Sequence, residues 1–167
     1  MQSFVSTERK VIAIEEAKGL SKRERESGRI VGLTNGCFDI LHCGHLSLLE
    51  RAREMCDLLI VGVNSDRSVR LLKGPDRPII PEDDRARLVA GLECVGAVVI
   101  FDEITAEKLI AEIAPSCYFK GGDYNASNLP EYALLSKMGI QPVFLNLEPG
   151  RSTTSIIKKV LARKGTT

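Results

Sequence analysis

Two histidines, His42 and His45, are three residues apart with Gly44 between them, and the chain contains no other histidine. Near the start of a helix, residues i and i+3 present their side chains in the same direction, so both imidazoles can contact one ligand. Gly44 lacks a Cβ and lets a polyphosphate approach the backbone closely. The N–H groups of a helix N-terminus add partial positive charge. The spacing therefore predicts a phosphate-binding site.

Two other roles are compatible with this histidine pair. One imidazole could cap the helix, or both could bind a metal ion with Asp39 or Cys43 as a third ligand. The position of the pair, just after a strand and a glycine-containing turn, favours phosphate, and we expect no metal site built from side chains. Asp39 then either orients a neighbouring donor or caps its own turn, and we favour the turn.

Two cations, Lys73 and Arg77, stand among glycine and proline residues, which favours a mobile loop. In one interpretation the flexible Lys73 ammonium follows the shifting charge of the phosphates while Arg77 contacts the acceptor. In the other, both are solvated loop side chains. Asp66, which precedes them, either binds the acceptor or caps a helix.

A second candidate phosphate site lies near the C-terminus, at Gly150-Arg151-Ser152-Thr153-Thr154. Ser and Thr are good helix N-caps, so a helix is expected to begin here in any case. The hydroxyl and N–H groups of that helix end could bind the β- and γ-phosphates, with Arg151 adding charge.

The elements that hold these residues alternate between strands and helices. Short apolar runs rich in β-branched residues predict strands at 30–34, 57–63, 97–101, 117–120 and 142–147. Helical patterns separate them, at 45–56, from 81 onward, at 105–113, at 130–138 and at 152–163. This order predicts an α/β fold, a Rossmann-like doubly wound sheet of about five parallel strands in three α/β/α layers. Residues 1–28 are expected to form an N-terminal helical extension and residues 29–167 one domain.

The polar, glycine-rich segments follow the predicted strands. In doubly wound sheets, ligands bind beyond the carboxyl ends of the strands, where the strand order reverses. We therefore expect one site that includes Asn35-Gly36, Asn64-Ser65-Asp66, Gly121-Gly122-Asp123 and Gly150-Arg151-Ser152.

Composition excludes several classes of protein. The net charge of +1 argues against a general nucleic-acid or membrane-surface binder, since such binding needs a clustered basic face. No apolar run is long enough to span a membrane, and the N-terminus lacks a secretory signal. Five cysteines without C-x-x-C spacing favour reduced thiols and a cytoplasmic location.

Several motifs in order resemble one enzyme family. Residues 42–45 (His-Cys-Gly-His), after Gly-Cys-Phe-Asp at 36–39, resemble the H-x-G-H motif of the nucleotidyltransferase superfamily. Residues 61–66, 72–74, 77–79, 120–124 and 152–154 narrow the resemblance to D-glycero-β-D-manno-heptose 1-phosphate adenylyltransferases, including the adenylyltransferase half of the bifunctional heptose kinase/adenylyltransferase. The resemblance covers about 29–159. It departs at Gly96 and Ala106, where the family commonly has Asp and Pro, and it is weaker over 125–141, a candidate region for choosing the acceptor.

The resemblance implies transfer of AMP from ATP to a sugar 1-phosphate, with release of pyrophosphate and with Mg²⁺ accompanying ATP. It also implies a homo-oligomer in a pathway to surface heptose, such as lipopolysaccharide core or capsule. It assigns catalysis to His42, His45 and Lys73, and acceptor binding to Asp39, Asn64, Asp66 and Arg77. It assigns nucleotide binding to Asn35, Gly36, Cys37, Phe38, Gly44, His45, Lys120, Gly121, Asp123, Arg151, Ser152, Thr153 and Thr154.

Other functions share parts of this pattern. A cytidylyltransferase that uses CTP and glycerol 3-phosphate has the same histidine motif, although residues 120–124 favour the heptose type. A pantetheine-phosphate enzyme usually has Pro at the position of Ile40, and a class I aminoacyl-tRNA synthetase would be longer. A nucleotide-binding regulator without turnover is the alternative outside enzymes.

Overall fold

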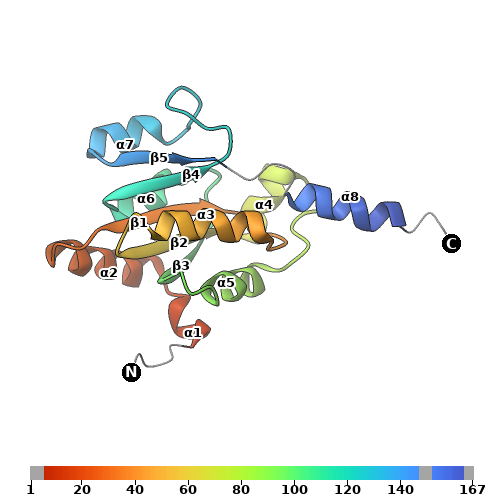
Figure 1. The fold of residues 1–167 in the computed structure, drawn as a ribbon, viewed down its shortest axis with the longest axis horizontal. Helices are drawn as coiled ribbons and strands as arrows, with labels where there is room; N and C mark the ends of the chain where they lie inside the picture. Colours follow the sequence, from red (N-terminus) through yellow and green to blue (C-terminus); the bar gives the residue numbers. More distant parts are fainter. Residues whose placement is uncertain (1–5, 147–151, 164–167) are drawn as a thin grey trace.

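The described residues, 6–146 and 152–163 of the computed structural model, form a five-stranded parallel sheet (Figure 1). The strand order is β3-β2-β1-β4-β5, and every neighbouring pair is parallel. The order reverses at β1, which pairs with both β2 and β4. This confirms the predicted doubly wound α/β sheet. The strands are β1 (Val31–Gly36), β2 (Leu58–Asn64), β3 (Ala97–Phe101), β4 (Cys117–Gly121) and β5 (Gln141–Leu145).

Helices cover both faces of the sheet, because the central strands are apolar on both sides. One buried cluster joins α2, α6 and α7 to one face, and a second joins α3 and α5 to the other. These clusters make the three predicted layers. The helices are α1 (Thr7–Lys10), α2 (Ile14–Glu26), α3 (Cys43–Arg53), α4 (Asp66–Lys73), α5 (Glu82–Ala90), α6 (Glu107–Ile113), α7 (Tyr132–Met138) and α8 (Thr153–Arg163).

The N-terminal helix α2 shares the core of the sheet. Ala17 is fully buried in the same cluster as Leu33 of β1 and Ile110 of α6. Just before α2, the Ile12 N–H donates a hydrogen bond of 2.9 Å to the Val98 carbonyl of β3. The described part of the predicted extension, residues 6–28, therefore contributes apolar side chains to the core on one face of the sheet.

The loop predicted around Lys73 is wrong in part, because Lys73 is the last residue of α4. Ser65 caps this helix by accepting a hydrogen bond from the Ser68 N–H at 3.1 Å. Gly74, with a positive φ of 100°, ends it. Gly74 and Pro75 directly follow Lys73, which is why the sequence favoured a loop at this position.

Candidate active site

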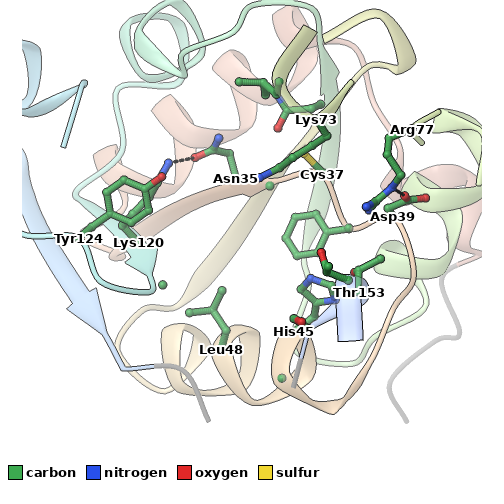
Figure 2. Close-up of a pocket in the computed structure, with 18 of the residues that line it drawn as sticks. Asn35, Cys37, Asp39, His45, Leu48, Lys73, Arg77, Lys120, Tyr124 and Thr153 are labelled. Carbon is green, nitrogen blue, oxygen red and sulfur yellow. Dashed lines mark hydrogen bonds and ion pairs between the residues drawn. The ribbon is translucent and has the colours of Figure 1, made fainter. Parts of the chain in front are cut away.

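A cavity of about 520 Å³ opens at the carboxyl ends of β1, β2 and β4 (Figure 2). It collects most of the predicted site residues from five separate segments. Those that line it are Asn35, Gly36, Cys37, Phe38, Asp39, His42, Gly44, His45, Asn64, Lys73, Arg77, Lys120, Gly121, Ser152, Thr153 and Thr154.

The two imidazoles stack on each other at the start of α3. Their ring centroids are 3.9 Å apart and their planes differ by 22°. His42 is the N-cap of α3, and its Nδ1 accepts a hydrogen bond from the Gly44 N–H at 3.1 Å. The predicted capping role is therefore present alongside the position in the cavity.

His45 is in a setting that keeps its imidazole neutral. Burial, and next the neighbouring His42, lowers the pKa of His45 to about 4. Its Nδ1 is buried and has no hydrogen-bond partner among the described residues. At neutral pH the free protein thus presents an uncharged ring that can gain a proton when an anion binds.

The turn between β1 and α3 brings Phe38 into the left-handed region, with φ of 47°. The ring of Phe38 is buried and lies 5.2 Å from that of His45, centroid to centroid. The next residue, Asp39, has a side chain that is 1% exposed. Its carboxylate accepts hydrogen bonds from the N–H groups of Ile79 and Ile80, at 2.7 and 3.0 Å, and pairs with Arg77.

Asp39 therefore orients a neighbouring donor, which is the interpretation that the sequence did not favour. The carboxylate holds the backbone of Ile79 and Ile80 and the guanidinium of Arg77 against the β1–α3 turn. Arg77, which is 18% exposed at its side chain, is placed at the cavity wall by this contact.

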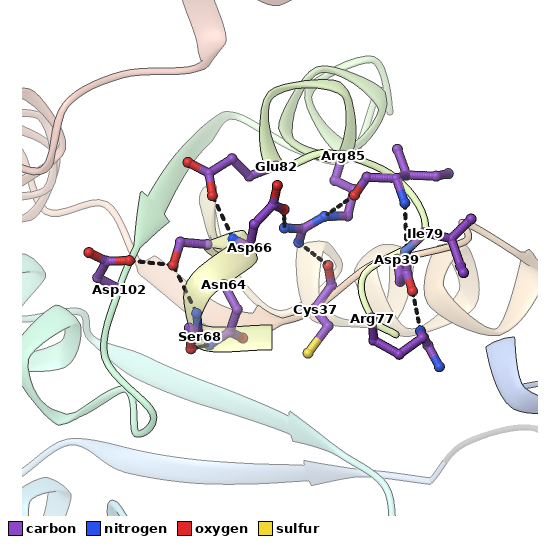
Figure 3. Close-up of polar contacts among 12 residues, drawn as sticks. Cys37, Asp39, Asn64, Asp66, Ser68, Arg77, Ile79, Glu82, Arg85 and Asp102 are labelled. Carbon is purple, nitrogen blue, oxygen red and sulfur yellow. Dashed lines mark hydrogen bonds and ion pairs between the residues drawn. The ribbon is translucent and has the colours of Figure 1, made fainter. Parts of the chain in front are cut away.

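Arg85 of α5, which sequence reasoning missed, contacts the same turn (Figure 3). Its side chain is fully buried. It donates hydrogen bonds to the carbonyls of Cys37 and Ile80 and forms an ion pair of 2.8 Å with Asp66. Asp66 thus faces Arg85 and is not part of the cavity lining.

The start of α8 meets the start of α3 across the cavity. Thr153 donates a hydrogen bond to the Ile40 carbonyl at 3.4 Å, in the loop just before the histidine pair. Ser152 accepts from the Ser155 N–H at 3.1 Å, as an N-cap does. Two helix N-termini therefore lie at one cavity, where the positive ends of their dipoles favour an anion.

Two predicted nucleotide contacts are not in this arrangement. Asp123 is exposed, is not part of the lining, and uses its carbonyl to accept from Asn128 at 2.9 Å. Arg151 lies outside the described residues.

This geometry agrees with a family comparison. Residues 33–159 match the model of the cytidylyltransferase-like family. The chain belongs to that family. As a cytidylyltransferase-like protein it is a nucleotidyltransferase, and the stacked histidines and the two helix ends lie together in its cavity.

The curated relatives are longer than this cytidylyltransferase-like chain. Each carries the name bifunctional protein HldE. The one from Trichlorobacter lovleyi is 48% identical over 140 residues, which is 84% of this chain and 28% of the relative. The one from Rhodopseudomonas palustris strain BisB5 is 47% identical over 164 residues, or 98% and 33% of the two chains. The chain thus spans about a third of their length.

A solved structure with a similar fold is the lipopolysaccharide core biosynthesis protein from Thermoplasma volcanium GSS1. It is 27% identical, with a TM-score of 0.60, and the match covers 72% of this chain and 97% of the neighbour. The Rossmann-like fold is confirmed by this match and by the sheet order.

The far end of the cavity is formed by Lys120 of β4. Its ammonium lies 3.3 Å from both Asn35 Oδ1 and the Tyr118 hydroxyl, and 5.1 Å from the centre of the Tyr124 ring. Burial lowers the pKa of Lys120. Tyr124 belongs to the segment 120–124, which was expected to contact a substrate. Tyr118 and Glu131 were not predicted: Tyr118 is a buried residue of strand β4, and Glu131 precedes α7 in a segment with no recognised motif.

Within the described ranges, no group of three His, Cys, Asp or Glu side chains could hold a metal ion. No helix in the same ranges is long and apolar enough to cross a membrane.

Proposed function

We propose that this nucleotidyltransferase transfers AMP from ATP to a sugar 1-phosphate, with D-glycero-β-D-manno-heptose 1-phosphate as the first acceptor to test. The observation that carries the proposal is the convergence of the imidazole pair, Lys73 and the start of α8 on one cavity. The choice of a sugar acceptor is supported by the motif set at 120–124 and by the HldE relatives.

In the proposed reaction, a phosphate oxygen of the acceptor attacks the α-phosphorus of ATP in line. The bond from that phosphorus to the oxygen that bridges to the β-phosphate breaks, and pyrophosphate leaves with the electron pair. Such a transfer depends on positioning and charge stabilisation more than on covalent chemistry. The helix ends at His42 and Thr153 would hold the triphosphate, and Lys73 would stabilise charge that develops in the transition state.

His45 would respond to the bound anion. A neutral imidazole can donate one hydrogen bond, and the negative triphosphate raises the pKa that burial has lowered. In this proposal the ring gains positive character only when the nucleotide is in place, so the empty site avoids two adjacent charged imidazoles.

Mg²⁺ is proposed as part of the substrate, MgATP. Phosphate oxygens and water supply most ligands of Mg²⁺ in such sites. A homo-oligomer and a cytoplasmic location likewise remain proposals.

The test is pyrophosphate release over a grid of ATP and CTP against several sugar 1-phosphates and glycerol 3-phosphate. Turnover with ATP and a sugar 1-phosphate is the expected result. Turnover only with CTP and glycerol 3-phosphate would replace the proposal with the cytidylyltransferase alternative, which the family name supports. ATP binding without pyrophosphate release from any pair would favour a regulator.

A further inference from the structure

Glu131 is a buried carboxylate at the edge of the cavity with an unused oxygen. It is the N-cap of α7, is 2% exposed and lines the cavity. Its Oε1 accepts a hydrogen bond of 3.0 Å from the Ala106 N–H. Its Oε2 is buried and has no hydrogen-bond partner among the residues that the structure describes. Buried carboxylate oxygens are normally paired, so this one can accept a hydrogen bond from a bound molecule.

Lys120 stands next to this carboxylate. Its Nζ lies 3.9 Å from Glu131 Oε1, and its side chain is 14% exposed. Two of its three N–H donors can be used by Asn35 and the Tyr118 hydroxyl, each at 3.3 Å. One donor remains for a ligand. Burial lowers the pKa of Lys120 and the charge of Glu131 opposes that shift, so Glu131 helps to keep the ammonium charged.

The pair therefore offers one acceptor and one donor side by side. A phosphate oxygen can only accept hydrogen bonds, and the Glu131 carboxylate would repel it. A hydroxyl group can donate to Glu131 and accept from Lys120 at the same time. The phosphates already have their own site at the two helix ends, where the lining lacks a free carboxylate because Asp39 is paired.

We propose that Lys120 and Glu131 form a hydroxyl-binding subsite, in which a sugar-ring hydroxyl donates to Glu131 Oε2 and accepts from Lys120. The proposal rests on the proposed function, since both substrates of that reaction carry such hydroxyls. The ribose of the nucleotide and the ring of the acceptor share this chemistry, and the experiment separates them.

The experiment compares wild type with Glu131→Gln, which keeps the Oε1 acceptor for Ala106 and removes the charge at the other position. Glu112→Gln on α6, whose partner is the exposed Lys18, is the matched control. Each protein is assayed for pyrophosphate release with ATP and a sugar 1-phosphate, then with 2′-deoxy-ATP, 3′-deoxy-ATP and singly deoxygenated acceptors. Binding of ATP and the two deoxy-ATP analogues is also measured by calorimetry.

For one hydroxyl, wild type is expected to lose about ten- to hundred-fold in kcat/KM on deoxygenation, as for a lost hydrogen bond to a charged group. Glu131→Gln should lose kcat/KM to a similar extent with the normal substrate, and little more with the deoxy substrate. The two changes are not additive because both remove the same contact. The substrate that shows this non-additivity is the source of the hydroxyl. The deoxy series on wild type gives this answer even if the variant folds poorly.

If Glu131→Gln discriminates between each substrate and its deoxy analogue to the same extent as wild type does, the proposed subsite is wrong. Absence of turnover with every sugar 1-phosphate would defeat the proposed function separately. In that case calorimetry still tests whether the hydroxyl belongs to the ribose of ATP. If Glu131→Gln prefers ATP over its deoxy analogues as strongly as wild type does, the proposed subsite is wrong as well.

Discussion

The rings of His42 and His45 lie almost parallel at 3.9 Å between centroids, so a proton on one imidazole makes a proton on the other costly. This contact places two potential cations at one helix N-terminus while the free protein keeps His45 uncharged. The stack thus links the geometry of the proposed phosphate site to the protonation of His45.

Replacing His45 with Ala is expected to lower kcat by about 10²–10³-fold, as for the loss of one placed donor in a transition-state site. The fold should persist, because the side chain faces the cavity. Pyrophosphate release and thermal melting measure the two effects. Cys43→Ala, an exposed position between the histidines, is the control and should stay near wild-type rate. A near-normal rate in His45→Ala would contradict the assignment.

Acid should destabilise the wild type through His45. The unfolded chain, with a pKa of about 6.5 for this group, binds a proton before the folded state, whose pKa is about 4. Stability therefore falls as the pH drops through that window, by up to about 2 kcal/mol at pH 5. Urea unfolding of wild type and His45→Asn at pH 7.5 and 5 measures the difference. If both proteins lose the same free energy of unfolding, the lowered pKa is not responsible.

Lys73→Ala is expected to reduce kcat more than it weakens ATP binding, because the ammonium at the end of α4 acts on charge that develops during transfer. Steady-state kinetics together with calorimetry for ATP separate the two quantities. Arg70→Ala, an exposed cation of the same helix that is not part of the cavity lining, controls for loss of charge. Equal losses in kcat and in ATP affinity would show only uniform binding.

Arg85→Met should lower the free energy of unfolding by about 1–3 kcal/mol, because it leaves the Cys37 carbonyl and the partly buried Asp66 carboxylate without their donor. Chemical unfolding measures this change. Arg87→Met, two residues later on α5 and 57% exposed, should change stability by less than about 0.5 kcal/mol. Similar values for the two variants would mean that Arg85 does not support the turn.

Local pattern alone was sufficient for much of the fold. The third strand, at 97–101, was predicted with the bounds that the structure has, because Ala97–Phe101 is a continuous apolar run between turn residues. A helix after Asp66 was one of two alternatives, but Lys73 was assigned to a loop because Gly74 and Pro75 follow it. In the structure Ser65 caps this helix, which runs through Lys73, and Val69 is buried.

The sequence by itself determined the α/β order, the three layers, and the two helix starts, one at the histidine pair and one at Ser152-Thr153-Thr154. Those features follow from periodicity, capping chemistry and glycine placement within a few neighbouring residues. Only the tertiary structure decided that Asp39 holds Ile79, that Arg85 supports the carbonyl of Cys37, and that Glu131 lies beside Lys120. The hydrogen bonds from Ile79 and Arg85 join residues 40 and 48 positions apart in the chain. Long-range contacts of this kind depend on which strands become neighbours in the sheet and on which loops then meet at its edge.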